Sequence, residues 1–353
     1  MIPPGSTIGI VGGGQLGRML AMAAAQLGYK CHIFDPHERP CAVDVAAEFT
    51  RAAYGDRAAL EAFGAKVDVA TYEFENLPVE PLGVLADKLH PGVKSLAVAQ
   101  DRAEEKAFIE STGARVAPWR SVASLEDVSR AVEELGVPIV LKTRRYGYDG
   151  KGQAWIRSPD EAGAAWESIR GEPAVAEAGV DFAAEFSVIV ARWADGRTTF
   201  WDSADNVHRE GILRTSTVPA GSEIAAQVEE ARAATAGIAE ALSHVGVLTV
   251  EFFASAAGPV VNEIAPRVHN SGHWTIEGAF TSQFEQHIRA ICDLPPGSTA
   301  LAAGSVVMDN LIGDEIHGWQ ELLSDPHAHV HIYGKGDARP GRKMGHVTRL
   351  VMP

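Results

Sequence analysis

Two apolar segments that flank a turn constrain the fold of this chain more than any other feature. Val247 to Phe253 and Pro259 to Ile264 are rich in β-branched residues, and the small residues Ser255 to Gly258 separate them. This pattern predicts a β-hairpin. With the turn centred on these small residues, Glu251 lies opposite Glu263.

The two opposed glutamates predict a metal site. Side chains directly opposite each other on one sheet face lie about 5 Å apart, and two like charges there repel unless a cation compensates them. Magnesium prefers carboxylate oxygens from one or two residues and takes water and substrate phosphates as its other ligands. We therefore predict that Glu251 and Glu263 bind Mg²⁺. The alternative is that both carboxylates face solvent on an edge hairpin, the usual position of strand acids.

The length and charge of the chain limit its possible partners. A chain of 353 residues fits two or three domains. The net charge of −15 argues against nonspecific binding to nucleic acid or to an anionic membrane, so anionic substrates need local basic clusters. Three cysteines without a CxxC pair favour a reducing compartment, the cytoplasm. No stretch approaches the roughly 20 apolar residues of a membrane span.

The N-terminal segment predicts a βαβ unit. Thr7 to Val11 and Lys30 to Phe34 form strands on either side of an amphipathic helix, and Asp35 ends the second strand. The turn before the helix contains the GxGxxG glycines Gly12, Gly14 and Gly17. An NAD-dependent oxidoreductase is therefore one interpretation. The motif is weak by itself, because a tight turn at a helix N-terminus binds any phosphate or none.

Further along the chain, acidic residues follow a strand and precede a polar helix. Val67 to Glu73 predicts a third strand, which runs into Phe74-Glu75-Asn76. The turn His90-Pro91-Gly92 and a following strand then lead to a helix over Asp101 to Ser111. In that helix Arg102 and Lys106 lie on one face, where a solvated surface is the ordinary interpretation.

A glycine-rich basic loop predicts a cover over a polyphosphate. Pro138 to Lys142 reads as a buried strand that ends in lysine, and the segment Thr143 to Gln153 contains three glycines and several cations. Backbone N–H groups in such a loop can approach phosphate oxygens, and Lys142 adds a positive charge. It is no Walker A loop, because GK[ST] is absent and no helix begins there. A basic surface hairpin is the alternative.

The remaining segments predict two helices and a C-terminal region of short strands. The helices extend over Gln227 to Leu242 and Phe280 to Ile291. His327, His329 and His331 alternate along one strand, for which we favour an exposed face over a metal site. A cluster of cations near Pro340-Gly341 suits a phosphate monoester: Lys335, Arg339, Arg342 and Lys343.

Three motifs, GGGQLGRM, YDGKGQ and NEIAPRVHNSGHWT, resemble in order and spacing those of the 5-(carboxyamino)imidazole ribonucleotide synthases, a family of ATP-grasp ligases in purine biosynthesis. The resemblance implies an α/β fold in three parts. A Rossmann-like N-terminal domain covers residues 1–98. A two-lobed ATP-grasp core covers 99–298, with its lid lobe at about 117–179. A small β-rich C-terminal domain covers 299–353.

The reaction that the resemblance implies joins ATP, bicarbonate and 5-aminoimidazole ribonucleotide, with Mg²⁺ as cofactor and a homodimer as the assembly. In this interpretation bicarbonate first takes the γ-phosphoryl group of ATP. Carboxyphosphate, or carbon dioxide from it, then carboxylates the amine. Three residues are implied as catalytic: Arg267 near bicarbonate, His269 beside the acceptor, and Asp149 as proton acceptor.

The resemblance also implies the residues that bind ATP, among which Glu177 takes the exocyclic amine of adenine and Glu185 the ribose. They are Arg102, Lys142, Gly147, Tyr148, Asp149, Gly150, Lys151, Gly152, Gln153, Glu177, Ala178, Gly179, Val180, Glu185, His208, Asn262 and Glu263. For the ribonucleotide, Glu73 contacts the ribose hydroxyls and three C-terminal cations contact the phosphate. The residues are Gln15, Leu16, Glu73, Tyr148, Asn270, Lys335, Arg342 and Lys343.

Two other functions remain open at this point. A different ATP-grasp ligase, such as a formate-dependent ribonucleotide formyltransferase, would keep the nucleotide residues and change the small acid. An NAD-dependent oxidoreductase would need nicotinamide chemistry elsewhere, and nothing after Asp35 supplies it.

Overall fold

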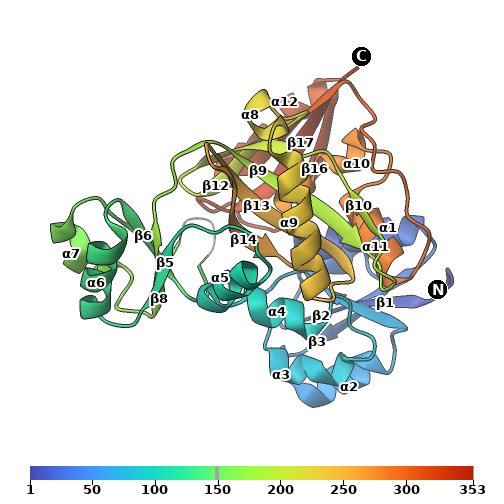
Figure 1. Ribbon diagram of the computed structural model, residues 1–353. Coiled ribbons are helices and arrows are strands. Elements are labelled where there is room, and N and C mark those ends of the chain that lie inside the picture. Colours follow the sequence, from blue (N-terminus) through green and yellow to red (C-terminus); the bar gives the residue numbers. More distant parts are fainter. Residues whose placement is uncertain (148–150, 353) are drawn as a thin grey trace.

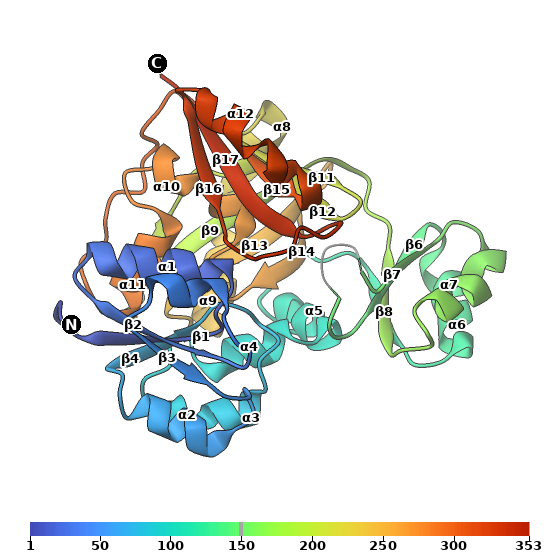
Figure 2. The ribbon, with the colours of Figure 1, turned by 180° about the vertical axis from the view of Figure 1, so that it is seen from behind.

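The computed structural model describes residues 1–147 and 151–352, and their strands form three sheets (Figure 1). Two sheets have four strands each, and a central sheet has nine. The view from behind shows that one four-stranded sheet lies against the body of the molecule, whereas the other belongs to a lobe that protrudes from it (Figure 2). Within these described ranges no helix is long and apolar enough to cross a membrane.

The N-terminal sheet is parallel, in the order β3-β2-β1-β4. Its strands are β1 (Thr7–Val11), β2 (Lys30–Asp35), β3 (Glu48–Arg51) and β4 (Val69–Tyr72). The predicted βαβ unit is confirmed, with α1 (Gln15–Gln26) between β1 and β2. Four residues of β1 and five of β2 are buried, which explains why these strands read as apolar runs. The other short helices are η1 (Cys41–Val45), α2 (Arg57–Gly64), α3 (Val79–Leu82) and η2 (Gly83–Leu85).

One predicted element of this part is wrong. The segment after His90-Pro91-Gly92 was expected to be a strand, but it forms helix α4 (Val93–Ala99), which begins after the N-cap Gly92. Its buried residues Ser95 and Leu96 face the core on one side only. In a segment of only seven residues, the pattern of apolar residues does not by itself distinguish a strand from a helix.

The protruding lobe is built on an antiparallel sheet in the order β5-β8-β6-β7. The strands are β5 (Trp119–Val122), β6 (Ile139–Thr143), β7 (Gln153–Ile156) and β8 (Ala174–Ala178). Helices α6 (Leu125–Leu135) and α7 (Ala162–Ser168), with the short η3 (Pro159–Glu161), cover this sheet (Figure 2). The N-cap of helix α6 is Ser124, whose side chain accepts a hydrogen bond from the Asp127 N–H. The predicted buried strand that ends near Lys142 is therefore confirmed as β6.

The central sheet carries the predicted hairpin at one edge, in the order β14-β13-β9-β11-β12-β15-β17-β16, with β10 paired to β9. Because β12 pairs with β15, the C-terminal strands continue the same sheet. Its strands are β9 (Phe182–Arg192), β10 (Thr198–Phe200), β11 (Ala204–Arg209), β12 (Ile212–Val218), β13 (Gly246–Ser255), β14 (Gly258–Ala265), β15 (Ser305–Ile312), β16 (Ala328–Ile332) and β17 (Lys343–Val351). His329 and His331 lie on β16, and His327 precedes it.

Helices pack around this sheet and connect it to the other two. They are α5 (Arg102–Ser111), α8 (Ser222–Ala225), α9 (Val228–Ala241), η4 (Asn270–Gly272), α10 (Thr275–Gly278), α11 (Gln283–Ile291), η5 (Gly313–Gly318) and α12 (Trp319–Ser324). The predicted α9 is confirmed to within one residue at each end. Helix α11 begins three residues later than predicted, because Ser282 caps it by accepting from the Glu285 N–H, while Phe280 N–H donates to the Ala300 carbonyl.

The N-terminal sheet and the central sheet share one hydrophobic core. Ile10 and Leu20 of the βαβ unit belong to the same buried cluster as Trp193, Trp274 and Ile288. The domain boundaries predicted at 98/99 and 298/299 stay predictions, because the packing is continuous across both sheets and the central sheet extends to Val351.

A buried histidine joins β4, β13 and α11. The Val247 N–H donates to Nδ1 of His287 at 3.0 Å, so the proton of the neutral ring is on Nε2, 2.8 Å from the hydroxyl oxygen of Thr71. Burial lowers the pKa of His287 to about 3. Burial likewise lowers the pKa of His244 to about 4 and those of His273 and His346 well below the usual value.

These histidines predict that the protein loses stability in mild acid. A ring that stays neutral when folded takes a proton in the unfolded chain below a pKa of about 6.5, so stability is complete above that pH and falls as the pH drops towards the folded pKa. Between pH 7.5 and 6 each such ring costs about 0.8 kcal/mol of unfolding free energy. His287→Gln should remove one such contribution, measured by urea unfolding at both pH values. An unchanged pH dependence in the variant would contradict this assignment.

Candidate active site

The hairpin β13–β14 places two carboxylates opposite each other, as the sequence predicted. Glu251 is the register partner of Glu263, and the strands meet again at Ser255 and Gly258 beside the turn. The register shifts after Glu251, so Asn262 is an extra residue on β14. The predicted pairing is confirmed, and it leaves a repulsion that neighbouring cations must offset.

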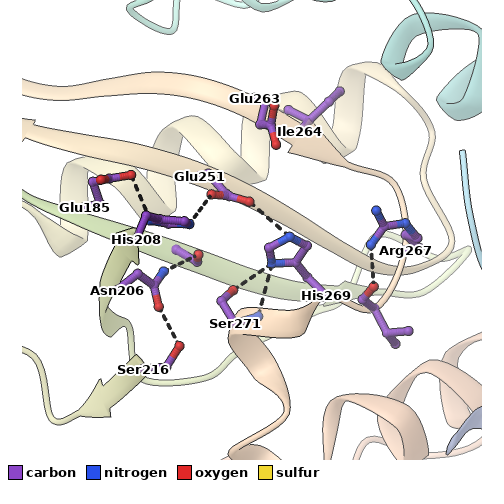
Figure 3. Close-up of polar contacts among 12 residues, drawn as sticks. Glu185, Asn206, His208, Ser216, Glu251, Glu263, Ile264, Arg267, His269 and Ser271 are labelled. Carbon is purple, nitrogen blue, oxygen red and sulfur yellow. Dashed lines mark hydrogen bonds and ion pairs between the residues drawn. The ribbon is translucent and has the colours of Figure 1, made fainter. Parts of the chain in front are cut away.

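Glu251 lies between two histidines (Figure 3). Its Oε1 is 3.0 Å from Nε2 of His269, and its Oε2 is 3.9 Å from Nε2 of His208. The other ring nitrogen of His208 is 3.0 Å from Glu185 on β9. Burial alone would raise the pKa of Glu251, but the facing His269, with His208 and Lys343 beyond it, lowers it to about 2. Glu251 is therefore ionised throughout the neutral range.

Glu263 is paired with an arginine from α5. Nη1 of Arg102 is 3.0 Å from Oε2 of Glu263. Burial would lower the pKa of Arg102, but Glu263 and then Glu105 raise it. Glu105, also on α5, accepts a hydrogen bond of 2.7 Å from the Ile264 N–H, which ties this helix to the strand beside Glu263.

The donor set of the hairpin fits a hard divalent cation. Glu251, Glu263 and the amide oxygen of Asn262 offer oxygen ligands from adjacent strands. Among the described residues no group of three or more His, Cys, Asp or Glu side chains forms a closed metal site. Magnesium needs no such cage, because it keeps water and phosphate oxygens among its ligands.

A lysine of the lobe reaches the hairpin. The ammonium of Lys142 on β6 donates to Asn262 Oδ1 at 3.1 Å and to Oε2 of Glu177 at 3.1 Å. The same carboxylate oxygen is 3.0 Å from the ammonium of Lys106. Lys106 is 1% exposed, so the face of α5 that carries Arg102 and Lys106 points inward and the solvated interpretation is wrong for Lys106.

In this cluster of three charges, burial disfavours the charged form of each group and the pairing between Glu177 and the lysines favours it. Burial lowers the pKa of Lys142, and Lys106 lowers it further, whereas Glu177 raises it. Burial would raise the pKa of Glu177, but Lys142 and Lys106 hold it below its usual value. Oε1 of Glu177 is buried without a hydrogen-bond partner among the described residues, which leaves one acceptor for a ligand amine. The predicted contact between Glu177 and adenine stays a prediction.

The glycine-rich loop of the lobe is described only at its two ends. Thr143 N–H donates to the Gly152 carbonyl, and the Gly147 carbonyl is 3.4 Å from Nη2 of Arg102. Lys142 and Gln153 are register partners at the base of the loop. The predicted roles of Tyr148, Asp149 and Gly150 lie outside the described residues. Those of Lys151 and of Ala178 to Val180 stay predictions.

The N-terminal glycine turn already holds a carboxylate of the chain itself. Glu73 accepts from Gly14 N–H at 2.6 Å and from Gly17 N–H at 2.8 Å. Asp35 accepts from Gly13 N–H and from the hydroxyl of Tyr54. Because these acids occupy the N–H groups that a dinucleotide pyrophosphate would need, the geometry does not favour the NAD interpretation. Gln15 and Leu16 lie in the first turn of α1, beside Glu73.

Arg267 has a partner that the sequence did not identify. Its Nε and Nη2 donate to the two oxygens of Glu75 at 2.5 and 3.0 Å. Of the two acids in Glu73-Phe74-Glu75, the sequence predicts a role only for the first. The bidentate pair joins positions 192 residues apart, so no local pattern contains it. Burial would lower the pKa of Arg267, but Glu75 raises it, so this cation stays charged.

The residues predicted for the acceptor come from both ends of the chain. Burial lowers the pKa of Lys335 to about 8, as does the nearby Arg342, while Cys41 and Glu73 raise it. The Lys335 ammonium donates to the Lys343 carbonyl at 2.9 Å. The charge of Lys343 also acts on Glu251. The structure thus brings the C-terminal cations near both the glycine turn and the hairpin.

Asn270 follows His269 at the exit of β14. It is 8% exposed, and neither atom of its amide has a hydrogen-bond partner among the described residues. A buried amide in that condition is available to a ligand or to water.

Three family descriptions match consecutive parts of the chain. Residues 5–100 match the ribonucleotide synthetase preATP-grasp domain. Residues 107–284 match the ATP-grasp domain. Residues 306–351 match the phosphoribosylaminoimidazole carboxylase C-terminal domain. The predicted fold class, with its three parts in this order, is confirmed.

Known proteins resemble the chain over nearly its whole length. The N5-carboxyaminoimidazole ribonucleotide synthase of Brucella melitensis is 49% identical, over 99% of this chain and 97% of that protein. The crystal structure of the Staphylococcus aureus N5-carboxyaminoimidazole synthetase with ADP has a TM-score of 0.94 and 39% identity, over 99% of this chain and 94% of that one. The Aspergillus clavatus synthase with ADP and 5-aminoimidazole ribonucleotide has a TM-score of 0.92 and 30% identity, over 98% and 94%.

Because two lysines pair with Glu177, we predict that the stability losses of the two lysine variants are not additive. Lys106→Met and Lys142→Met each leave Glu177 with one ammonium, and each should lose about 1–3 kcal/mol of stability. The double variant leaves a buried carboxylate unpaired, so its loss should exceed the sum of the two by roughly 1–3 kcal/mol. Urea unfolding measures the cycle, and adding Glu177→Gln to the double variant should recover the excess. Simple additivity would contradict the shared pairing.

Proposed function

Because the chain belongs to the N5-carboxyaminoimidazole ribonucleotide synthases, a family of ATP-grasp ligases, we propose that it carboxylates the amine of 5-aminoimidazole ribonucleotide at the expense of ATP. The product is N5-carboxyaminoimidazole ribonucleotide, an intermediate of purine biosynthesis. The observation that carries this proposal is the opposed pair Glu251 and Glu263, with Lys142 of the lobe in contact with Asn262, the residue before Glu263.

The nucleotide would bind between the lobe and the hairpin. Lys142 and Arg102 lie at the hairpin and supply positive charge for the phosphates. The free Oε1 of Glu177 supports the adenine amine contact, and Glu185, held by His208, supports the ribose contact. Gly147, Lys151, Gly152 and Gln153 belong to the loop that would cover the phosphates.

Magnesium would be held by Glu251 and Glu263. Bound there, the cation would supply positive charge that offsets the charge of the phosphates during phosphoryl transfer. Neighbouring residues hold the two carboxylates in place: Arg102 orients Glu263, and His269 donates from Nε2 to Glu251. Since each carboxylate is held in place by a neighbour, its free oxygens keep a fixed direction.

We take bicarbonate as the small acid. One of its oxygens attacks the γ-phosphorus, the bond to the bridging oxygen of ADP breaks, and carboxyphosphate forms. Arg267 is buried and charged, and Glu75 orients its guanidinium, so it is suited to stabilise the charge that develops on the transferred group. The ribonucleotide amine then attacks the carboxyl carbon, phosphate leaves and the amine loses a proton. We retain Asp149 as the acceptor of that proton.

The ribonucleotide would bind between the glycine turn and the C-terminal cations. Glu73 is fixed by Gly14 and Gly17 and keeps free lone pairs for two ribose hydroxyls. Lys335, Arg342 and Lys343 supply the charge for its phosphate. Asn270 offers a buried amide, and the first turn of α1 at Gln15 and Leu16 offers backbone contacts.

The proposal also includes an assembly and a compartment. A homodimer is the assembly that the family resemblance implies, and light scattering measures it directly. A reducing cytoplasm is the compartment that best suits Cys31, Cys41 and Cys292, which are all free and buried.

The identity of the small acid is the sharpest test of this function. In carbonate-depleted buffer with ATP, Mg²⁺ and the ribonucleotide, ADP release should be slow and should return when bicarbonate is added. Formate and acetate should not restore it, because neither supplies the carboxyl group of the product. A coupled ADP assay measures each rate.

The matched variant for this assay is Glu263→Gln, which keeps the size of the side chain and removes one carboxylate charge. It should lower bicarbonate-dependent turnover about a hundredfold or more, since one contact made to the phosphoryl-transfer site is lost. Restoration by formate in place of bicarbonate would favour the formyltransferase interpretation. If the variant turns over at the native rate, the assignment of the metal site to the hairpin is wrong.

A further inference from the structure

A buried glutamine at the start of α11 holds the backbone of His269 on both sides. Oε1 of Gln283 accepts from the His269 N–H at 2.9 Å, and its Nε2 donates to the His269 carbonyl at 2.6 Å. Gln283 is fully buried. A side-chain amide that bonds both backbone groups of one residue does what a neighbouring strand would do.

The backbone and the side chain of Gln283 are both held in place by their surroundings. Its backbone N–H donates to the hydroxyl oxygen of Thr275 at 2.9 Å, and that hydroxyl donates to the Gly272 carbonyl at 2.6 Å. A β-carbon added at Gly272 would lie 2.7 Å from Oε1 of Gln283, so the turn packs directly on the amide. The two opposite hydrogen bonds to His269 also define which end of the amide is oxygen.

The segment that Gln283 holds pairs with no strand in the part of the chain that the structure describes. His269 has extended backbone angles and is the N-cap residue of η4, which is only three residues long. Its N–H donates to Gln283 of α11, and its carbonyl accepts from Gln283 and also from the Gly272 N–H at 3.0 Å. Buried backbone groups need such partners, and Gln283 contacts both of them.

The position of this backbone sets the direction of the imidazole (Figure 3). Nδ1 of His269 accepts from the Ser271 N–H at 3.3 Å and lies 2.8 Å from the Ser271 hydroxyl. Nδ1 therefore carries a lone pair, and the ring proton is on Nε2, which points at Glu251 over 3.0 Å.

We propose that Gln283 is a positioning residue, which clamps the backbone of His269 so that the Nε2 proton of its ring stays directed at Glu251. The inference rests on the proposed function, in which His269 and Glu251 belong to the active site. Gln283 touches neither ATP nor acceptor in the proposed function, and it reaches the site through His269. Its Nε2 also lies 3.3 Å from Nδ1 of the buried His273.

The same helix contains a matched control. Gln286 is also fully buried, and its amide accepts from Gly297 N–H at 2.9 Å and donates to the Gly297 carbonyl at 2.9 Å. It makes a further contact of 3.1 Å to the hydroxyl of Thr199. Gly297 belongs to the connection between α11 and β15, which contains no residue assigned to the site. The two glutamines thus differ mainly in which backbone they hold.

The experiment compares Gln283→Met with Gln286→Met in the full chain. Both variants remove an equivalent pair of hydrogen bonds, so both should lower the melting temperature by a similar amount. Only Gln283→Met should lower the maximal bicarbonate-dependent rate, by about tenfold or more, with the KM for ATP changed less than about threefold. Gln286→Met should stay within about twofold of the native rate.

A spectroscopic readout separates positioning from catalysis. Long-range ¹H–¹⁵N correlation of the histidine rings reports which nitrogen carries the proton, and His269→Gln identifies the signals of His269. The native ring should give the Nε2–H pattern, Gln286→Met should keep it, and Gln283→Met should broaden or shift it. This readout needs no turnover, so it tests the clamp even if the assigned reaction is wrong.

Equal rates in the two variants, whether both native or both reduced, would overturn the proposal. So would an unchanged His269 signal in Gln283→Met. If Gln283→Met does not fold, Gln283→Glu against Gln286→Glu carries the comparison, because a carboxylate keeps the acceptor for the backbone N–H and loses only the donor. Absence of any bicarbonate-dependent rate in the native protein would instead contradict the proposed function.

Discussion

The opposition of Glu251 and Glu263 across one hairpin is the constraint around which the rest of the site is arranged. The register of β13 and β14 fixes two negative charges on adjacent strands, and their repulsion has to be offset from outside the hairpin. The Arg102 guanidinium of α5 offsets one charge, and the Nε2–H of His269 donates a hydrogen bond to the other carboxylate. The helix and the loop on either side of β14 therefore have to pack against it, and Glu105 and Gln283 hold them there.

Buried charges of the protruding lobe are also stabilised by pairing. Lys142 would be an isolated buried cation at the end of β6 without Glu177, and Glu177 would be an isolated anion without its two lysines. Because Lys142 also touches Asn262, the lobe meets the hairpin through a polar contact. Polar contacts of this kind stabilise less than a packed apolar interface, and they can be exchanged for contacts with phosphate oxygens.

Local patterns predicted the parts of the site that lie within one element. The hairpin register, the strand before Lys142 and the βαβ unit follow from apolar periodicity and turn residues. The Arg267–Glu75 pair and the clamp of Gln283 on His269 do not, because each joins two segments through side chains whose spacing has no period. Helix α4 was not predicted for another reason, since the short segment Val93–Ala99 mixes apolar residues with Lys94 and Ser95 and fits a strand as well as a helix.

Oxygen tracing can follow the transfer of the γ-phosphoryl group of ATP to bicarbonate that we propose for this hairpin. With ¹⁸O-labelled bicarbonate, ATP and 5-aminoimidazole ribonucleotide, the attacking oxygen stays on phosphorus when carboxyphosphate gives up its carboxyl group. We expect one ¹⁸O atom in the released phosphate for each turnover, seen as an isotope shift in its ³¹P resonance. Released phosphate without the label, formed together with the carboxylated product, would contradict it.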